Sequence, residues 1–144
     1  MNIAVVLSGG TGTRLGAEIP KQYIQVKGKT IISYCLDVME KCSQIDAIQI
    51  VADESWHDAI LEGRLSKFKG FSKPGANRQL SIFSALEDIK NYAREDDIVI
   101  IHDAARPCVY AKMFADLIQA CKEHDGALPV LPMKDTVYMS GWMS

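Results

Sequence analysis

A glycine-rich segment, LSGGTGTRLGAEIPKQY, begins at Leu7 at the end of the apolar run 3–7. Glycine tolerates positive φ, so consecutive backbone N–H groups in such a segment can turn toward one anion. The junction between a buried strand and a following helix is also a common place for a bound phosphate. Arg14 and Lys21 add two long cationic side chains. These residue types together predict a phosphate-binding loop, whereas glycines alone would also fit an ordinary turn with solvated charges.

The glycine spacing argues against the two commonest nucleotide-binding fingerprints. A dinucleotide fingerprint starting at Gly10 and Gly12 would need a third glycine where Leu15 stands. A Walker A loop needs Gly-Lys followed by Ser or Thr, and the segment contains no such triplet. The loop therefore favours a phosphate ligand without matching a NAD-binding domain or a P-loop ATPase.

A second polar segment, KPGANRQLS at residues 73–81, combines a turn with a helix start. Gly75 lies in the turn and Asn77 is a good N-cap for the helix that follows. Backbone amides at this helix start, joined by Arg78 and Ser81, can grip a base edge or a phosphate. Arg78 as an ordinary surface charge is the alternative.

A third polar segment, HDAARP at residues 102–107, ends an apolar run. Asp103 stands where a carboxylate commonly holds Mg²⁺ against a nucleotide. Arg106 is a candidate for a second phosphate, and the alternative is a loop arginine that pairs with Asp103. His102 fits a packed or hydrogen-bonded histidine better than a catalytic base.

Short apolar runs alternate with stretches of helical period along the chain. Strands are expected at 3–7, 47–52, 98–101 and 127–131, and helices at 30–42, 55–61, 77–92 and 112–124. This alternation predicts an α/β fold with a largely parallel sheet covered on both faces. Ligands in such folds bind beyond the carboxyl ends of the strands, where the polar segments are expected to lie.

Composition limits the classes of function. The 144 residues are 48% hydrophobic and 24% charged, with a formal net charge of −2, which predicts one globular domain over residues 1–144 and no nucleic-acid partner. The N-terminus has no basic leader and its apolar run is short, so we expect a cytoplasmic protein without membrane contact. The four cysteines lack zinc-site spacing, and Cys35 and Cys42 are expected to be buried, reduced thiols.

Five motifs give the sequence a family resemblance: LSGGTGTRLG, IPKQY, GANRQLSI, HDAARP and MKDTV. In this order and spacing they resemble the cytidylyltransferases that form CDP-linked polyol phosphates. Members of that family act on 2-C-methyl-D-erythritol 4-phosphate in isoprenoid synthesis or on ribitol 5-phosphate in teichoic acid synthesis. The resemblance extends to about Tyr138. The PKQ triplet separates it from sugar-nucleotide pyrophosphorylases, whose similar loop is generally followed by PKP.

The resemblance implies a Rossmann-like, three-layer α/β domain, C-terminally incomplete, and Mg²⁺-dependent attack of a polyol phosphate on the α-phosphorus of CTP, releasing pyrophosphate. Arg14 and Lys21 match the pair that stabilises charge on the reacting phosphoryl group. Asp103 would hold the metal, and Arg106 and Thr136 match positions near the acceptor. The remaining residues that the resemblance assigns to nucleotide binding are Leu7, Ser8, Gly9, Gly10, Thr11, Gly12, Gly75, Arg78, Ser81 and Ala104.

The motifs do not agree on the acceptor. Ser8-Gly9 replaces the Ala-Ala usual in methylerythritol enzymes and brings GGTGTR closer to the ribitol enzymes, whereas HDAARP leans toward the methylerythritol group. The expected acceptor is 2-C-methyl-D-erythritol 4-phosphate, with ribitol 5-phosphate as the alternative.

The end of the chain bears on activity and assembly. Members of the resembled family are homodimers that continue past the position of GWMS through a dimerising β-arm and a further catalytic lysine. A chain ending there is expected to fold its nucleotide half and to transfer cytidylyl groups poorly. An inactive nucleotide-binding domain and, less favoured by the glycine spacing, a NAD-dependent dehydrogenase domain are the other classes left open.

Overall fold

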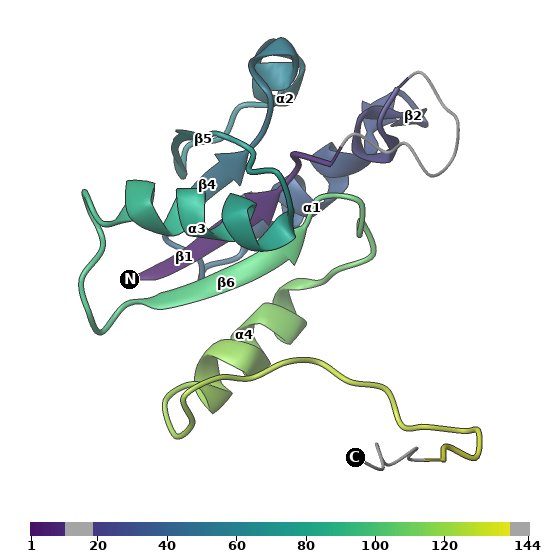
Figure 1. Ribbon diagram of the computed structural model, residues 1–144, viewed down its shortest axis with the longest axis vertical. Helices are drawn as coiled ribbons and strands as arrows, with labels where there is room; N and C mark the ends of the chain where they lie inside the picture. Colours follow the sequence, from purple (N-terminus) through teal and green to yellow (C-terminus); the bar gives the residue numbers. More distant parts are fainter. Residues whose placement is uncertain (11–18, 139–144) are drawn as a thin grey trace, which may run out of the picture.

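A sheet of parallel strands forms the centre of the computed structural model, which describes residues 1–10 and 19–138. Its strands are β1 (Asn2–Leu7), β4 (Ala47–Val51), β5 (Phe68–Ser72) and β6 (Ile98–Asp103). They pair in the order β5-β4-β1-β6, and every neighbouring pair is parallel. The register sets Leu7 beside both Val51 and Asp103. The carboxyl ends of β4, β1 and β6 therefore lie at one edge of the sheet (Figure 1).

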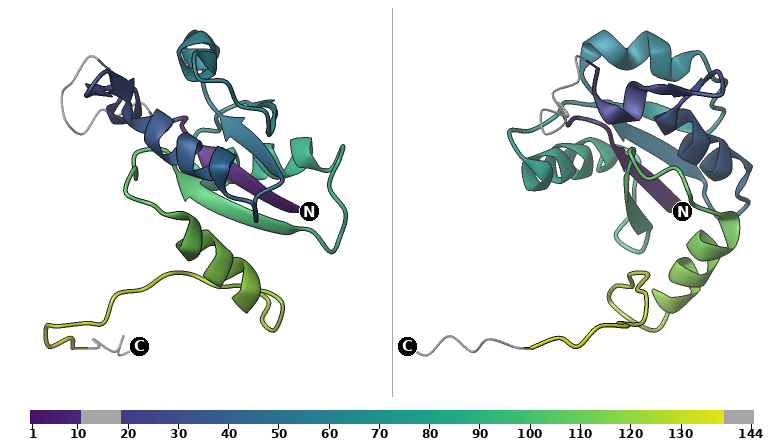
Figure 2. Two further views of the ribbon diagram at one scale, coloured as in Figure 1. Left: turned by 180° about the vertical axis from the view of Figure 1, so that it is seen from behind. Right: turned by 90° about the vertical axis from the view of Figure 1, so that its right-hand side faces the viewer.

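Helices cover both faces of this sheet, as the three views in Figures 1 and 2 show. The longest are α1 (Ile31–Lys41), α3 (Arg78–Ile89) and α4 (Ala111–Ala120). Ala4 and Val6 of β1 belong to the apolar cluster that includes α1 and Phe114 of α4. Ile3 and Val5 pack on the opposite face, against α3. This alternation confirms the predicted α/β fold, with a parallel sheet buried on both sides.

Short elements fill the connections after β1 and β4. They are η2 (Lys21–Tyr23), β2 (Gln25–Val26), β3 (Lys29–Thr30), η3 (Glu54–Trp56) and α2 (His57–Leu61). β2 and β3 form an antiparallel hairpin whose two turn residues, Lys27 and Gly28, both have positive φ. That geometry matches the right-handed twist of a two-residue hairpin. None of the helices in the described part of the chain is long and apolar enough to cross a membrane.

The strand predicted at 127–131 is wrong. This segment forms no strand in the structure, and its apolar side chains are exposed, Leu131 by 89%. After α4 the chain runs away from the sheet, as the right-hand view of Figure 2 shows. Apolar composition alone does not make a strand, because the backbone must also pair with a neighbour. Pro129, in the middle of the run, has no N–H to donate to such a ladder.

The sequence also gave no expectation of β5. Its residues, FKGFS, contain a lysine and a glycine instead of a β-branched run. Gly70 has a φ of +157°, and the pairing of β4 with β5 shifts register between Ile48 and Gln49. A glycine in a strand commonly marks such an irregularity, and it weakens the sequence pattern of the strand.

The cysteines follow the prediction. Cys35 and Cys42 are buried free thiols on and after α1, and Cys108 is exposed. Burial raises the pKa of Cys35 to about 12, so this thiol stays protonated at neutral pH.

Candidate active site

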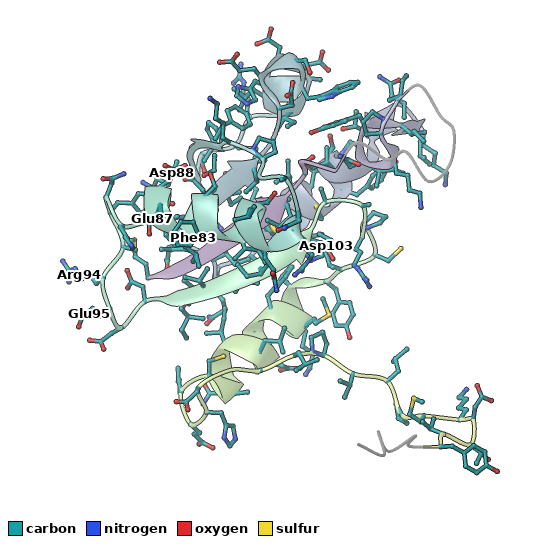
Figure 3. The ribbon with its side chains drawn as sticks, viewed as in Figure 1. Phe83, Glu87, Asp88, Arg94, Glu95 and Asp103 are labelled. Atoms are coloured by element: carbon teal, nitrogen blue, oxygen red, sulfur yellow. The ribbon has the colours of Figure 1, made fainter. Side chains whose placement is uncertain are left out.

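A cleft of about 390 Å³ opens at the carboxyl ends of β1 and β6, beside the start of α3. Small-molecule sites commonly have volumes of about 300–1,000 Å³. Figure 3 labels Asp103 at this place, where β6 ends next to α3. Residues from all three predicted polar segments contribute to the cleft. Its lining consists of Leu7, Gly9, Gly10, Gln22, Gly75, Ala76, Asn77, Arg78, Ser81, Asp103 and Ala105.

The first two polar segments touch at Gly9. A Cβ added to Gly9 would lie 2.6 Å from the Cβ of Pro74, closer than real Cβ atoms approach. Gly10 has nothing within 4 Å of an added Cβ. Glycine is therefore required at position 9 by the close contact between loops, while the space beside Gly10 is open.

The second segment is ordered by its own hydrogen bonds. Asn77 caps α3 as predicted, with its Oδ1 accepting from the Leu80 N–H at 2.9 Å. Ser81 accepts from the Gly75 N–H at 3.0 Å. A Cβ on Gly75 would lie 2.4 Å from the Cβ of Leu80, so the turn packs against the first turn of the helix. Ser81 thus holds the Gly75 turn, and its hydroxyl hydrogen donates to no other residue in the part of the chain that the structure describes.

Asp103 lies between two arginines. Its Oδ1 is 3.2 Å from Nε of Arg78, and its Oδ2 is 3.4 Å from Nε of Arg106. The pairing of Arg106 with Asp103 is the alternative that the sequence left open. Both guanidinium groups are largely exposed, so each pair contributes at most about 1 kcal/mol. Arg78 and Asp103 line the cleft, and this exposed pair makes that side suitable for a polyanion, because Arg78 can exchange Asp103 for another anionic partner at little cost.

His102 is a packed histidine, in agreement with the interpretation of its position in the sequence. Its Nε2 donates to the backbone carbonyl of Arg106 at 2.9 Å, and its ring meets Phe114 edge-on. Burial lowers the pKa of His102, and the hydrogen bond to Arg106 opposes that shift. The imidazole therefore holds the turn that carries Asp103 and Arg106 and does not line the cleft.

Several predicted residues do not line the cleft. Lys21 is exposed on η2, one residue before Gln22. Ala104 is buried, with its N–H donating to the Leu7 carbonyl at 2.9 Å. Arg106 lines a second, wider groove beside α4. Thr136 is exposed in the segment after α4 and lines neither cavity. The predicted residues Thr11, Gly12 and Arg14 lie outside the described residues.

Gln22 and Tyr23 hold the site, and the sequence did not predict either of them. Gln22 donates from Nε2 to the carbonyls of Ser8 and Gly10, both at 2.9 Å. The Tyr23 hydroxyl accepts from Oγ of the buried Ser8 at 2.7 Å. Both lie in the PKQY stretch, whose short helical turn has no periodicity that would mark them as supports of the loop.

The described part of the chain offers one carboxylate for a metal at the cleft, that of Asp103. No three Asp, Glu, His or Cys side chains gather as metal ligands within residues 1–10 and 19–138. Mg²⁺ bound with a nucleotide takes most of its ligands from phosphates and water. The donor set therefore fits a metal that arrives with a triphosphate better than one held by the protein alone.

The sequence matches the family model described as IspD, 2-C-methyl-D-erythritol 4-phosphate cytidylyltransferase, over residues 2–142. The ribitol-5-phosphate cytidylyltransferase of Lacticaseibacillus paracasei is 36% identical, with the match covering 96% of this chain and 61% of that protein. The 2-C-methyl-D-erythritol 4-phosphate cytidylyltransferase of Clostridium perfringens (strain SM101) is 38% identical, and there the match covers 94% of this chain and 60% of that protein.

A solved structure agrees with these sequence matches. The 2-C-methyl-D-erythritol 4-phosphate cytidylyltransferase of Francisella tularensis superposes with a TM-score of 0.69 at 30% identity. The superposition covers 85% of this chain and 52% of that one. The chain thus spans about 60% of the length of the curated relatives that it matches.

Proposed function

The chain belongs to the 2-C-methyl-D-erythritol 4-phosphate cytidylyltransferase family, and we propose that it transfers CMP from CTP to that polyol phosphate with release of pyrophosphate. The observation that carries the proposal is the meeting of three polar loops in one cleft. Gly9 and Gly10 contribute backbone N–H groups, and Gly75 contributes a second turn. Arg78 contributes a guanidinium group that can leave Asp103 for a phosphate. Backbone N–H donors and an arginine are groups that bind phosphates well.

The proposed reaction is a single displacement at phosphorus. A phosphate oxygen of the acceptor attacks the α-phosphorus of CTP, and the bond to the β-phosphate breaks as pyrophosphate leaves with the electron pair. Lys21 and Arg14 are proposed to stabilise the charge on the phosphoryl oxygens, the largest electrostatic requirement of such a transfer. Since both substrates carry phosphates, positioning can supply much of the rate without a covalent intermediate.

The cleft suggests how CTP would be placed. The backbone of residues 7–12 would cradle the triphosphate, and Gly75, Arg78 and Ser81 would contact the cytosine and ribose. Asp103 would hold Mg²⁺ together with the phosphates, and that ion would neutralise part of their charge. Release of Arg78 from Asp103 would free its guanidinium for the nucleotide. Ala104 is proposed to act through its backbone beside β1, and Arg106 and Thr136 to face the acceptor.

Ribitol 5-phosphate is the second candidate acceptor, and one observation favours it. Ser8 takes the place of an alanine usual in the methylerythritol enzymes, and its hydroxyl is engaged by Tyr23 inside the loop that follows β1. The relative from Lacticaseibacillus paracasei carries the name of the ribitol enzyme.

Nucleotide and acceptor can be tested in sequence. Calorimetry with Mg²⁺ and CTP, ATP, GTP or NAD should show binding of CTP in preference to the other nucleotides. Pyrophosphate release should then depend on one of the two polyol phosphates. Binding of CTP without turnover by either acceptor would indicate a nucleotide-binding domain without transferase activity. Preference for NAD would overturn the proposal.

A further inference from the structure

Gln22 makes two hydrogen bonds to the backbone of residues 8–10, called the glycine turn below. Its Nε2 donates to the Ser8 carbonyl and to the Gly10 carbonyl, each at 2.9 Å. An amide NH₂ has two hydrogens, so a single group can satisfy both carbonyls. Gln22 as a whole is only 6% exposed, which keeps water from competing for these bonds. One buried side chain therefore fixes two peptide units of the glycine turn.

The direction of these carbonyls decides where neighbouring N–H groups point. In a planar trans peptide the C=O and the next N–H point in opposite directions. With the Ser8 carbonyl pointing at Gln22, the N–H of Gly9 in the same peptide unit points away from Gln22. Within the described residues neither Gly9 nor Gly10 donates a backbone hydrogen bond, and both line the cleft. N–H groups that have no partner among the described residues and line a cleft are the donors that an anionic ligand requires.

The support under Gln22 is a buried, hydrogen-bonded and stacked tyrosine. The next residue, Tyr23, donates its hydroxyl to the same Ser8 carbonyl at 3.0 Å and accepts from the Ser8 hydroxyl at 2.7 Å. The Tyr23 ring stacks on Trp56 of η3, with centroids 4.1 Å apart and planes 9° from parallel. Because η2 is anchored in the core in this way, Gln22 cannot follow the glycine turn if the turn moves, and it restrains the turn instead.

We propose that Gln22 is a positioning residue that holds the glycine turn in the conformation that receives the nucleotide phosphates. The identity of the ligand rests on the proposed function, whereas the restraint itself does not. Without the two hydrogen bonds the turn samples other conformations, and the apparent affinity falls with the fraction that stays competent. If about a tenth of the molecules keep the competent turn, affinity for the phosphates drops about tenfold.

The first test uses Gln22→Met, which keeps the length of the side chain and removes its donor. Gln119→Met is the matched control, since Gln119 is exposed on α4 and lines neither cavity. Calorimetry should show about tenfold weaker binding of CTP with Mg²⁺ to Gln22→Met and no change in the control. Without nucleotide, ¹⁵N relaxation should show the order parameter of Gly10 falling from about 0.85 to below about 0.6, with a smaller fall at Gly9, because the Tyr23 hydroxyl still donates to the Ser8 carbonyl.

A second variant, Gln22→Glu, separates loss of the donor from repulsion of phosphate. Its carboxylate has no hydrogen to donate, but the protonated carboxyl has one. In nucleotide-free Gln22→Glu protein the order parameter of Gly10 should therefore be low at neutral pH and recover partly in acid, while that of Gly10 in Gln22→Met should stay low.

The outcomes distinguish this inference from the proposed function. If the wild-type chain binds no nucleotide, the proposed function fails, and the order parameters alone still decide the role of Gln22. A folded Gln22→Met protein with wild-type order parameters would overturn the inference. So would Gln22→Glu order parameters that are low and independent of pH. Wild-type CTP affinity in a variant with a mobile turn would also overturn it, because the turn would then not position phosphates.

Discussion

Lys21 is the described cation that the proposed reaction depends on most. It is exposed on η2 directly before Gln22, whose side chain lines the cleft. Lys21→Ala should lower the rate of CTP-dependent pyrophosphate release by about 10²-fold or more, the scale of losing one transition-state donor, with a smaller change in CTP affinity. Lys41→Ala is the control, because Lys41 is exposed at the far end of α1. Equal rates for the two variants would remove Lys21 from the mechanism.

Asp103 offers a prediction whose sign depends on magnesium. Asp103→Asn removes the carboxylate that pairs with Arg78 and Arg106. Without Mg²⁺ the variant should bind CTP at least as tightly as the wild type, since two guanidinium groups are released and one negative charge is lost. With Mg²⁺ it should bind CTP more weakly, because a ligand of the metal is missing.

Calorimetry with CTP in EDTA and in Mg²⁺ measures both effects for Asp103→Asn. The melting temperature should hardly change, since exposed ion pairs contribute little to stability. Weaker binding in both conditions would instead mean that Asp103 contacts the nucleotide directly.

At the scale of elements, the site is made by contacts between loops that the sheet brings together. Gly9 touches Pro74 and Gly10 faces open space, so the same substitution should act differently at the two positions. Gly9→Ala should lower the free energy of unfolding by about 1–3 kcal/mol, as overpacking does. Gly10→Ala should leave stability within about 0.5 kcal/mol and weaken CTP binding, because its methyl group would enter the lining of the cleft.

Denaturant unfolding measures the free energy of unfolding of each glycine variant, and calorimetry measures its affinity for CTP. The expected pattern is a stability loss at Gly9 and an affinity loss without a stability loss at Gly10. A larger stability loss at Gly10 than at Gly9 would contradict the contact between the two loops.

Which parts of the site the sequence could predict depends on how each part is encoded. The three polar segments were predictable because each follows or precedes an element with clear periodicity, and parallel strands bring their carboxyl ends together. The role of Gln22 was not predictable, since a three-residue turn has no periodicity. The hydrogen-bond partners of Gln22 are backbone carbonyls, which every residue has whatever its type. The pairing of Asp103 with Arg78 joins residues 25 positions apart, and only the packing of α3 beside β6 reveals it.

At the scale of the molecule, the apolar side chains of the core are buried and those of the segment after α4 are exposed. The fold class followed from alternating periodicity, but burial of the last apolar run did not, because a hydrophobic run specifies a strand only where a sheet edge accepts it. The 127–131 run is apolar in sequence and exposed in the structure. One buried leucine and one exposed leucine allow the effect of the same substitution on stability to be compared.

Leu36 of α1 is 2% exposed and Leu131 is 89% exposed. Leu36→Ala leaves a cavity in the largest apolar cluster and should cost about 2–5 kcal/mol of unfolding free energy. Leu131→Ala should change it by less than about 0.5 kcal/mol, since the side chain has little contact to lose. Urea unfolding of both variants with an unchanged m-value measures the difference. A loss above about 1 kcal/mol for Leu131→Ala would show that this run is packed in solution, as a strand on the open edge of β6 would be.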